Sequence, residues 1–265
     1  MGFSLMAWNV RHFFGAPQRT RDVARWVRRL DADVIGFCEL ASRVAARALM
    51  AELDEYDFGV TDGVGQLELL LGWRRRRFAQ VLFTQRREFR NGQQHLRPGA
   101  LLSLRVRPRT FYHVLLLHAD AGSTPHDYQN RQALVGKIWS LQRALASLPR
   151  QRGLARLVVI GDLNVVGDGN GVSARAELEA LADAARARGM RLCRKDAPYT
   201  WHPPSARGVP ADLDHVLASD EVRLRRLDGA AAVRVVGWNE LAGARRAAFL
   251  RELSDHAALY CEVSR

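Results

Sequence analysis

The chain has 265 residues, 48% of them hydrophobic and 26% charged, a composition that excludes intrinsically disordered and fibrous proteins. Its formal net charge is +12, and only two of the 40 basic residues are lysines, Lys137 and Lys195. Such an arginine excess indicates either a polyanionic partner such as nucleic acid or a GC-rich coding sequence, and the composition leaves both interpretations open.

Strand-like and helix-like patterns alternate from the N-terminus onward. Residues 3–9 are predicted to form a strand, residues 19–30 a helix, and residues 34–38 a strand that ends just before Glu39. The further predicted elements are a helix at 43–54, strands at 67–73, 78–84, 100–106 and 112–117, a helix at 127–148, a strand at 157–160, a helix at 173–188, and strands at 213–217 and 259–263. No repeat or linker interrupts them, so one α/β domain over residues 1–265 is expected.

Four consecutive arginines, Arg74 to Arg77, separate two of these predicted strands. Such a run could hold a phosphate group, because each guanidinium offers several donors. A solvated hairpin turn is the favoured interpretation, since charge runs usually face solvent.

Polar residues recur at the C-terminal ends of the predicted strands, or on the loop before the last one. They are Asn9, Glu39, His118, Asp162, Asn164, Asp214, Asp255 and His256. Ligand sites form at such places because a rigid sheet presents several side chains to one crevice. Repeated carboxylates there favour a hard cation such as Mg²⁺ or Mn²⁺. Taken alone, each residue could equally be a cap or a turn former.

Several of these residues lie in motifs that resemble the endonuclease/exonuclease/phosphatase superfamily. The segment Gly161-Asp162-Leu163-Asn164, after an aliphatic strand, is similar to the GDxN signature of that family. The other similar segments, in the family's order, are Trp8-Asn9, residues 33–39, Leu117-His118, Tyr199-Thr200-Trp201, residues 213–217 and Ser254-Asp255-His256. Together they span residues 8–256, and the ordered set is far more specific than any single motif.

The resemblance implies a four-layer α/β sandwich, with two packed mixed β-sheets flanked by helices. It also implies a metal-dependent hydrolase that cleaves phosphate esters by in-line attack of water. The implied metal-binding residues are Glu39, as the principal ligand, with Asn9 and Asp255. The implied catalytic residues are His118, Asp162, Asn164, Asp214 and His256.

The chemistry of the reaction suits these residue types. A cation neutralises the charge that makes phosphodiesters resist attack, and a positioned base activates the water. By resemblance, Asp162 and Asn164 orient that water, while His256, braced by Asp255, is the general acid/base or stabilises the transition state. The usual partner of this histidine in the family is the distant aspartate, here Asp214.

Only a few residues of the sequence bear on the identity of the substrate. The segment Trp8–Gly15 looks like pancreatic-type deoxyribonucleases, which also carry an arginine at the position of Arg11. Trp201 could stack on a base or belong to the core, and Asn170 could contact substrate from a Gly-rich turn. The absence of an arginine before Leu213 argues against abasic-site repair, and Asn130-Arg131-Gln132 is a pattern more often met in bacterial members of unassigned substrate.

We therefore expect a Mg²⁺- or Mn²⁺-dependent phosphodiesterase whose substrate is DNA or RNA. The alternative is a phosphatase or phosphodiesterase for a small molecule or a lipid headgroup. The three cysteines have no metal-type spacing and are expected to be buried, reduced thiols. A signal peptide is not expected from residues 3–8, and no apolar run reaches the roughly 20 residues that span a bilayer, so a cytoplasmic protein is expected.

Overall fold

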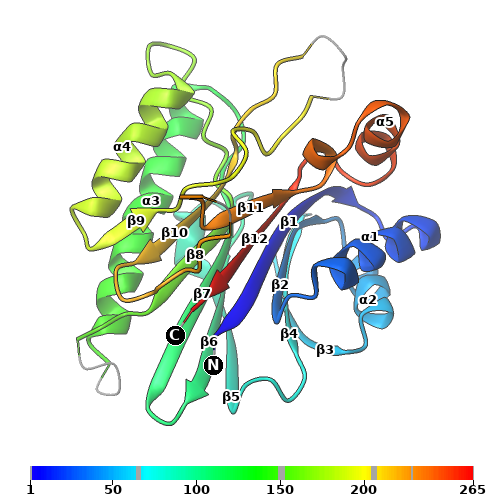
Figure 1. Cartoon of the computed structure of the whole chain (residues 1–265). Coiled ribbons are helices and arrows are strands. Elements are labelled where there is room, and N and C mark those ends of the chain that lie inside the picture. The colour runs from blue at the N-terminus through cyan, green and yellow to red at the C-terminus, as the bar shows by residue number, and fades with distance from the viewer. Residues whose placement is uncertain (1, 64–66, 149–152, 204–207, 228, 265) are drawn as a thin grey trace.

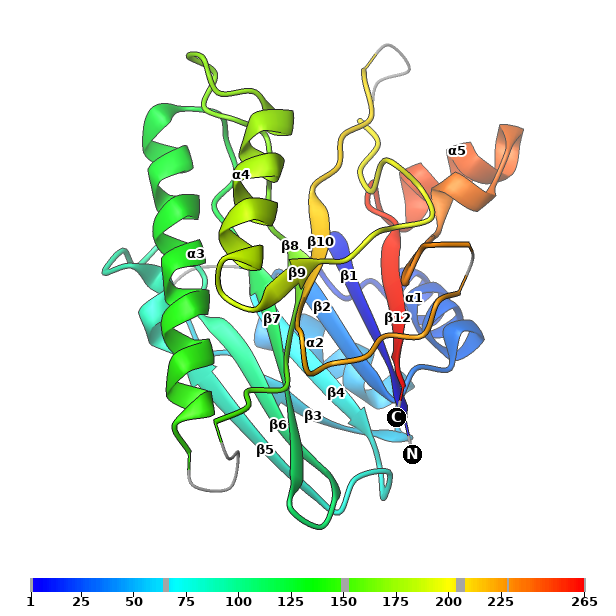
Figure 2. The same cartoon turned by 60° about the vertical axis from the view of Figure 1, so that its left-hand side comes forward.

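Two mixed β-sheets pack face to face, with helices on the outer faces (Figures 1 and 2). A computed structural model describes residues 2–63, 67–148, 153–203, 208–227 and 229–264, and within them each sheet has six strands. The first sheet has the order β11 (Val233–Val236), β12 (Ala258–Val263), β1 (Phe3–Phe13), β2 (Val34–Leu40), β4 (Glu68–Arg74), β3 (Tyr56–Val60). The second has the order β5 (Gln80–Arg86), β6 (Gly99–Arg107), β7 (Thr110–His118), β8 (Leu157–Asp162), β10 (Asp214–Ser219), β9 (Met190–Leu192).

The helices complete a four-layer α/β sandwich, as expected. The helices α1 (Pro17–Leu30) and α2 (Arg43–Glu52) cover the first sheet, whereas α3 (Pro125–Ala146) and α4 (Ala174–Arg186) cover the second (Figures 1 and 2). A further helix, α5 (Gly243–Glu252), lies beyond the end of β1 (Figure 1). Two short 3-10 helices are η1 (Arg87–Arg90) and η2 (Trp238–Glu240). No helix among the described residues is long and apolar enough to cross a membrane.

Each predicted strand and helix is present, with its ends shifted by a few residues. Six elements among the described residues were not predicted: three strands (β3, β9 and β11), one α-helix (α5) and the two 3-10 helices (η1 and η2). The strand β3 contains Asp57 and Gly59, which are residue types depleted in strands, and β9 is only three residues long. These elements form because neighbouring strands and the core select them, not because of local periodicity.

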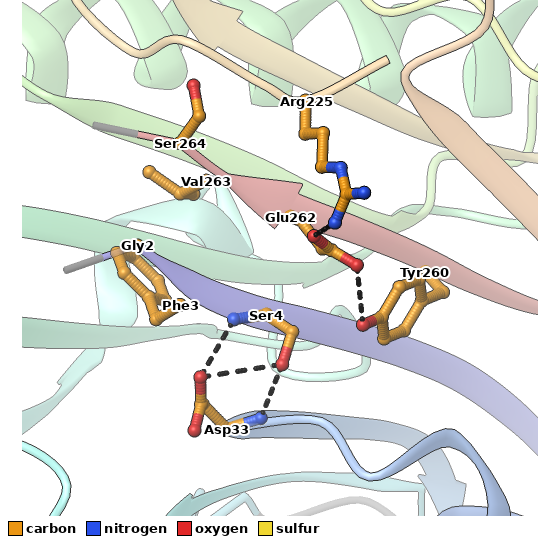
Figure 3. A pocket seen from close by; sticks show the side chains of 9 residues that line it. All are labelled: Gly2, Phe3, Ser4, Asp33, Arg225, Tyr260, Glu262, Val263 and Ser264. Carbon is orange, nitrogen blue, oxygen red and sulfur yellow. Dashed lines mark hydrogen bonds and ion pairs between the residues drawn. The ribbon is translucent and has the colours of Figure 1, made fainter. Parts of the chain in front are cut away.

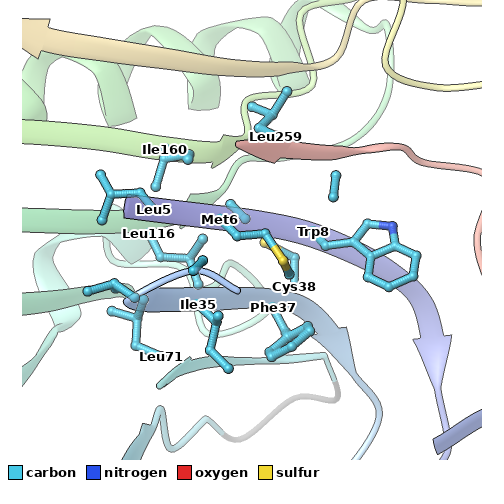
Figure 4. Close-up of a cluster of buried hydrophobic side chains, with 14 of the residues drawn as sticks. Leu5, Met6, Trp8, Ile35, Phe37, Cys38, Leu71, Leu116, Ile160 and Leu259 are labelled. Carbon is cyan, nitrogen blue, oxygen red and sulfur yellow. The ribbon is translucent and has the colours of Figure 1, made fainter. Parts of the chain in front are cut away.

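The main hydrophobic core lies between the two sheets (Figure 4). Leu116 of β7 projects from the second sheet toward Gly36 of β2, where an added Cβ would lie 3.0 Å from its Cδ1 atom. Ile160 of β8 belongs to the same cluster, together with Leu5 and Met6 of β1. A smaller cluster packs α3 and α4 against the outer face of the second sheet. The central strands are therefore buried on both faces.

Two parallel strand pairs, one in each sheet, determine where functional groups can gather. The strands β1 and β2 are parallel, as are β7 and β8, while the remaining pairs are antiparallel. In register, His118 lies opposite Asp162, and Asp162 lies opposite Asp214 at the start of β10. The carboxyl ends of four central strands thus meet at one edge of the sandwich.

The arginine run lies at the other edge, so the structure contradicts a phosphate-binding role for it beside the site. Arg74 follows Trp73, which pairs with Val34 at the beginning of β2, far from Glu39 at the end of that strand. Three of the arginines form ion pairs with acids: Arg74 with Asp31, Arg75 with Asp57, and Arg77 with Asp33. The turn also differs from the expected hairpin, because it connects β4 in one sheet with β5 in the other.

Candidate active site

Six of the predicted residues converge where β1, β2, β7, β8 and β10 meet. Two groups of potential ligand atoms share Asp162: one is Glu39, His118 and Asp162, and the other is Asp162, Asp214 and His256. Within each group the atoms lie within 4.8 Å of one another. The side-chain amide of Asn9 joins the two sheets by donating to Glu39 Oε1 and to Asp162 Oδ2, each at 2.9 Å.

The Glu39 carboxylate is held in a fixed orientation. Its Oε1 atom accepts from Asn9, and its Oε2 atom accepts from the backbone N–H of His12 at 2.8 Å. The backbone N–H of Arg11 donates to Asn9 Oδ1 at 2.9 Å, which fixes the amide in turn. The carboxylate remains 14% exposed, so a ligand can reach it.

The backbone around the site is strained. Arg11, His12, Glu39 and Asn164 have φ values of 40°, 43°, 65° and 49°, in the left-handed region that non-glycine residues rarely adopt. Each such residue costs of the order of 1–3 kcal/mol, which the surrounding structure must offset. For Arg11, His12 and Asn164 the strained backbone N–H groups bind Asn9, Glu39 and Asp162, so the strain serves to orient these side chains.

The imidazole of His256 lies between two buried carboxylates. Its Nδ1 atom is 2.8 Å from Asp214 Oδ2, and its Nε2 atom is 3.8 Å from Asp162 Oδ2. Burial alone would lower the pKa of His256, but the charge of Asp214 and the hydrogen bond to it raise that pKa to about 10. The ring is therefore cationic at neutral pH.

Two further groups of the site, Asp162 and His118, have pKa values that shift in opposite directions. Burial, and then the nearby Asp214 charge, raise the pKa of Asp162 to about 7. For His118, burial and then the positive charges of Arg97 and His256 hold the pKa well below its usual range. Its Nε2 atom lies 3.7 Å from both Glu39 Oε1 and Asp162 Oδ2. The site thus combines a neutral histidine, a cationic histidine and a carboxyl group that titrates near neutral pH.

Asn164 binds the groups on either side of it. Its backbone N–H donates to Asp162 Oδ1 at 3.0 Å, and its side-chain amide donates to the carbonyl of Ala119 at 3.1 Å. Ala119 directly follows His118, and its own N–H donates to the carbonyl of Asp162. The loops that follow β7 and β8 are therefore joined at the site.

The donor set of the site fits a divalent cation. Glu39 and Asp162 offer hard carboxylate oxygens, the ligands that Mg²⁺ and Mn²⁺ prefer, and Asn9 holds the two groups close together. A cation would also offset the burial of several carboxylates in one place, which otherwise raises the pKa of Asp162.

Asp255, Trp201, Arg11 and Asn170 are the other residues that the sequence predicts to bind a ligand. Asp255 Oδ2 accepts from the indole N–H of Trp201 at 3.1 Å, whereas its Oδ1 is buried without a partner among the described residues. The guanidinium of Arg11 donates to the carbonyls of Leu250 and Arg251 at the end of α5. Asn170 is exposed in the loop after β8, where its N–H donates to Asp168. The ligand-binding roles of all four stay predictions.

Four residues at or beside the site were not predicted from the sequence. Thr200 accepts from the N–H of Asp214, and Ser254 joins the carbonyl of Asn9 to the N–H of His256. Lys195 contacts Asp212 and donates to the carbonyl of Asp214 at 2.6 Å. Arg97 places its charge near His118. Thr200 and Ser254 stand within the quoted motifs, so only Lys195 and Arg97 lacked any signal.

A hollow at the opposite end of β1 and β12 is a poorer candidate (Figure 3). Its polar side chains are already bound to one another. The backbone N–H of Ser4 donates to Asp33, and Arg225 and Tyr260 both donate to Glu262 (Figure 3). At the site end, Glu39, Asp162 and Asp214 form ion pairs only with histidines, and no arginine or lysine among the described residues forms an ion pair with them.

Comparison with known proteins identifies the family and the fold. The Endonuclease/Exonuclease/phosphatase family matches residues 6–256. No protein with a curated description matches. A crystal structure of TDP2 from C. elegans superposes with a TM-score of 0.71 and 17% identity, covering 100% of this chain and 76% of that chain.

Two further structures resemble this chain over its whole length. The D. rerio TDP2 complexed with single strand DNA product has a TM-score of 0.71 and 16% identity, covering 100% of this chain and 99% of that one. A mannosyl-6-phosphatase from Bacteroides thetaiotaomicron has a TM-score of 0.67 and 14% identity, covering 99% and 100%. At these identities the likeness shows the fold.

Proposed function

Because the chain belongs to the endonuclease/exonuclease/phosphatase family of phosphoesterases, we propose that it is a divalent-metal-dependent phosphodiesterase that cleaves DNA or RNA. The observation that carries the proposal is the convergence of Asn9, Glu39, Asp162 and His256 at one edge of the sandwich. A bound Mg²⁺ or Mn²⁺, held by Glu39 with Asn9 and Asp255 beside it, would neutralise charge on the phosphate.

The remaining residues supply the proton transfers. A water attacks phosphorus and loses its proton to Asp162, a buried carboxylate that the side-chain amide of Asn9 holds at the site. As the ester bond breaks, His256 stabilises the charge and can donate a proton from Nε2 to the leaving oxygen, because Asp214 occupies Nδ1. Neutral His118 donates a hydrogen bond to a phosphoryl oxygen, and Asn164 holds Asp162 in place.

Arg97 supports a polynucleotide as substrate. Its charge acts on His118 at the centre of the site, and its Nε atom has no hydrogen-bond partner among the described residues. Arg11 is less suited to this role, since its guanidinium already binds two carbonyls of α5. The D. rerio structure, which holds a single strand DNA product, accords with this proposal. A mannosyl-6-phosphatase has a similar fold, so a small phosphate ester is the second candidate substrate.

Metal dependence is tested first. We expect hydrolysis of plasmid DNA, single-stranded DNA, RNA or a generic phosphodiester to stop in chelator and to return with Mg²⁺ or Mn²⁺. Glu39→Gln should weaken metal binding in calorimetry without unfolding the domain, whereas Glu179→Gln, an exposed control on α4, should behave as wild type. Full activity after exhaustive dialysis against chelator would exclude the proposed chemistry.

Binding measurements then separate a nuclease from an enzyme for small phosphate esters. With the inactive Asp162→Asn variant, the affinity for a short duplex should fall with salt at a log–log slope of about −0.9 per phosphate contacted. Arg97→Gln should make that slope shallower by about one unit. Arg107→Gln, at the far end of β6, should leave it unchanged. A flat salt response with competition by sugar phosphates would select the second candidate.

A further inference from the structure

Two buried polar residues in the first turns of α3, Asn130 and Arg131, bind the loops around the site. We call this pair the α3 anchor. Asn130 is 4% exposed and Arg131 is 2% exposed, values unusual for such polar side chains. Both belong to the Asn130-Arg131-Gln132 segment, which the proposed reaction leaves without a role.

Arg131 joins the loop after β7 to the loop after β8. Its Nε and Nη2 atoms donate to the two carboxylate oxygens of Glu177 on α4, at 2.8 and 3.1 Å. The same guanidinium donates to the carbonyl of Gly122 at 2.7 Å and to that of Gly167 at 2.5 Å. Glu177 in turn accepts from the N–H of Gly167 at 2.8 Å. The guanidinium of Arg131, a residue of α3, thus forms hydrogen bonds with α4, with the loop after β7 and with the loop after β8.

Asn130 connects α3 both to the loop after β7 and to a third loop. Its side-chain amide donates to Asp120 Oδ2 at 2.7 Å, in the loop after β7. Its Oδ1 atom accepts from the side-chain amide of Gln93 at 2.6 Å, in the loop between η1 and β6. That loop carries Arg97.

The three anchored loops carry the groups that the proposed reaction uses. His118 immediately precedes the loop after β7, whose first residue, Ala119, accepts from the Asn164 amide. Asn164 belongs to the loop after β8, and its N–H orients Asp162. Neither anchor residue is among the groups that converge at the site, so their effect on the reaction must pass through the loops.

Stability alone does not account for a buried ion pair in this place. Removing Arg131 and Glu177 from water carries a large desolvation penalty, and apolar residues of similar size often replace such pairs without loss of stability. An apolar pair could fill the space, but it could not bind the carbonyls of Gly122 and Gly167. The guanidinium, with its fixed fork of donors, can hold both loops at once.

We propose that Asn130 and Arg131 are positioning residues, which set the separation of the three loops and so the reactive geometry of the site. The proposal rests on the function proposed above. Arg131 acts on the chemical step, because the loops that it joins hold Asn164 and, through it, Asp162. Asn130 acts on substrate binding, because its bond to Gln93 places the loop that carries Arg97.

The first experiment separates positioning from stability. In Arg131→Met/Glu177→Leu the ion pair is replaced by apolar side chains, so no buried charge is left unpaired and we expect the variant to fold. Its free energy of unfolding should be lower than that of wild type, because the carbonyls of Gly122 and Gly167 lose their partner, so kcat is measured at temperatures where the variant stays folded. We expect kcat to fall by roughly 100-fold with little change in KM, since misplacement of a reacting group by about 1 Å costs about that factor. Arg131→Lys, which keeps the charge but not the fork of donors, should lie between the double variant and wild type.

Leu145→Ala is the matched control, because it removes a core side chain near the other end of the same helix. It should lower the free energy of unfolding while keeping kcat near wild type at temperatures where it stays folded. Wild-type kcat in the folded double variant would overturn the proposal for Arg131.

The second experiment concerns Asn130 and uses a variant of a partly exposed loop residue, which should fold normally. Gln93→Ala should raise KM by roughly two- to tenfold, the range that one ordinary hydrogen bond corresponds to, and leave kcat nearly unchanged. Asn130→Ala should show at least the same rise, and the two effects should not add in the double variant. Gln80→Ala, on the exposed edge strand, is the control. Additive effects of the two substitutions would overturn the role of Asn130.

An activity-free measurement distinguishes failure of this proposal from failure of the proposed function. In Arg131→Met/Glu177→Leu, backbone amide hydrogen exchange should accelerate at Ala119 and Asn164 and stay unchanged at Leu5, in the core of the other sheet. If wild type hydrolysed no phosphoester, the function would fail, yet accelerated exchange would still support the anchor. Unchanged exchange at both loop positions would overturn the anchor even in an active enzyme.

Discussion

The charge of His256 depends chiefly on Asp214, with smaller contributions from the charges of Asp162 and Asp255. Burial favours the neutral imidazole, and the carboxylate at 2.8 Å from Nδ1 reverses that preference. At the same time the Asp214 charge raises the pKa of Asp162. The Asp214 carboxylate therefore raises the pKa of His256, the proposed acid, and the pKa of Asp162, the proposed base.

Replacing Asp214 by Asn should undo the shift of the His256 pKa. In chelator, the wild-type His256 ring should stay protonated until about pH 10, whereas in Asp214→Asn burial dominates and the ring should titrate far lower. Turnover with metal should fall roughly 10²- to 10⁴-fold, the usual contribution of one acid/base group. Titration of the imidazole resonances by NMR checks the first outcome. An unshifted His256 resonance in the variant would contradict this account.

His113 provides a pH dependence that is separate from the site. Burial lowers its pKa to about 4, and the ring lies 2.8 Å from Ser103 Oγ. Between pH 6.5 and 4 the unfolded chain takes up a proton at this position and the folded chain does not. The free energy of unfolding should therefore fall as the pH is lowered through this window, by on the order of 3 kcal/mol for this group.

His113→Gln removes this titration while keeping an acceptor for Ser103. We expect the stability difference between wild type and variant, from urea unfolding in chelator, to shift in favour of the variant as the pH falls from 7.5 to 4.5. Above pH 7.5 the difference should stay constant. A constant difference over the whole range would contradict the buried, neutral state of His113.

At the scale of elements, the end of β8 shows why the GDxN segment begins with glycine. Gly161 has a φ of 137°, and a Cβ at this position would lie 2.2 Å from the carbonyl oxygen of Leu117 on β7. The neighbouring strand can therefore approach only if this residue has no side chain. The close approach brings His118 and Asp162 to facing positions of β7 and β8.

Gly161→Ala should consequently cost both stability and activity. Because the clash is with backbone on a buried strand, we expect a loss of more than about 1 kcal/mol in the free energy of unfolding. Turnover should fall further than stability explains, since Asp162 moves with the strand. Gly92→Ala, at a position with positive φ but open space around it, is the control. Equal effects of the two substitutions would show that the contact with Leu117 is unimportant.

At the scale of the whole molecule, the site exists only while the two sheets remain packed. Asn9 and Glu39 belong to one sheet, and His118 and Asp162 to the other. The packing rests on the apolar side chains between the sheets, among which Leu116 is fully buried (Figure 4). Loss of this packing should therefore remove metal binding and activity together.

Two Leu→Ala substitutions, one between the sheets and one on the surface, test how far stability depends on this packing. Leu116→Ala should lower the free energy of unfolding by about 2–5 kcal/mol, whereas Leu82→Ala, at a side chain 57% exposed on edge strand β5, should change it by less than about 0.5 kcal/mol. Denaturation followed by fluorescence and by circular dichroism should give coincident transitions, because residues 1–265 are predicted to form one domain. Separate transitions for the two sheets would contradict the single domain.

Some residues of the site could be predicted from the sequence, and others could not. Asp162 and Asn164 were identified because their motif is contiguous and follows an aliphatic strand. Lys195 and Arg97 had no signal, because nothing near them in sequence marks what they contact in space. Arg11 was assigned to substrate, and the structure shows its guanidinium bound to α5, a helix that the sequence did not predict.

By itself, the sequence determined the alternation of strands and helices, the family, and the residue types of the site, because periodicity and motifs are local properties. Only the tertiary structure decided which groups meet. Asn9 binds Asp162, 153 residues away, a contact that no motif indicates. His256 binds Asp214, the partner that the family resemblance implied, and only the fold sets the distance between them. These contacts depend on strand order, on register and on which faces of the two sheets pack together. Those features result from the energy of the whole core, so no local segment of the chain encodes them.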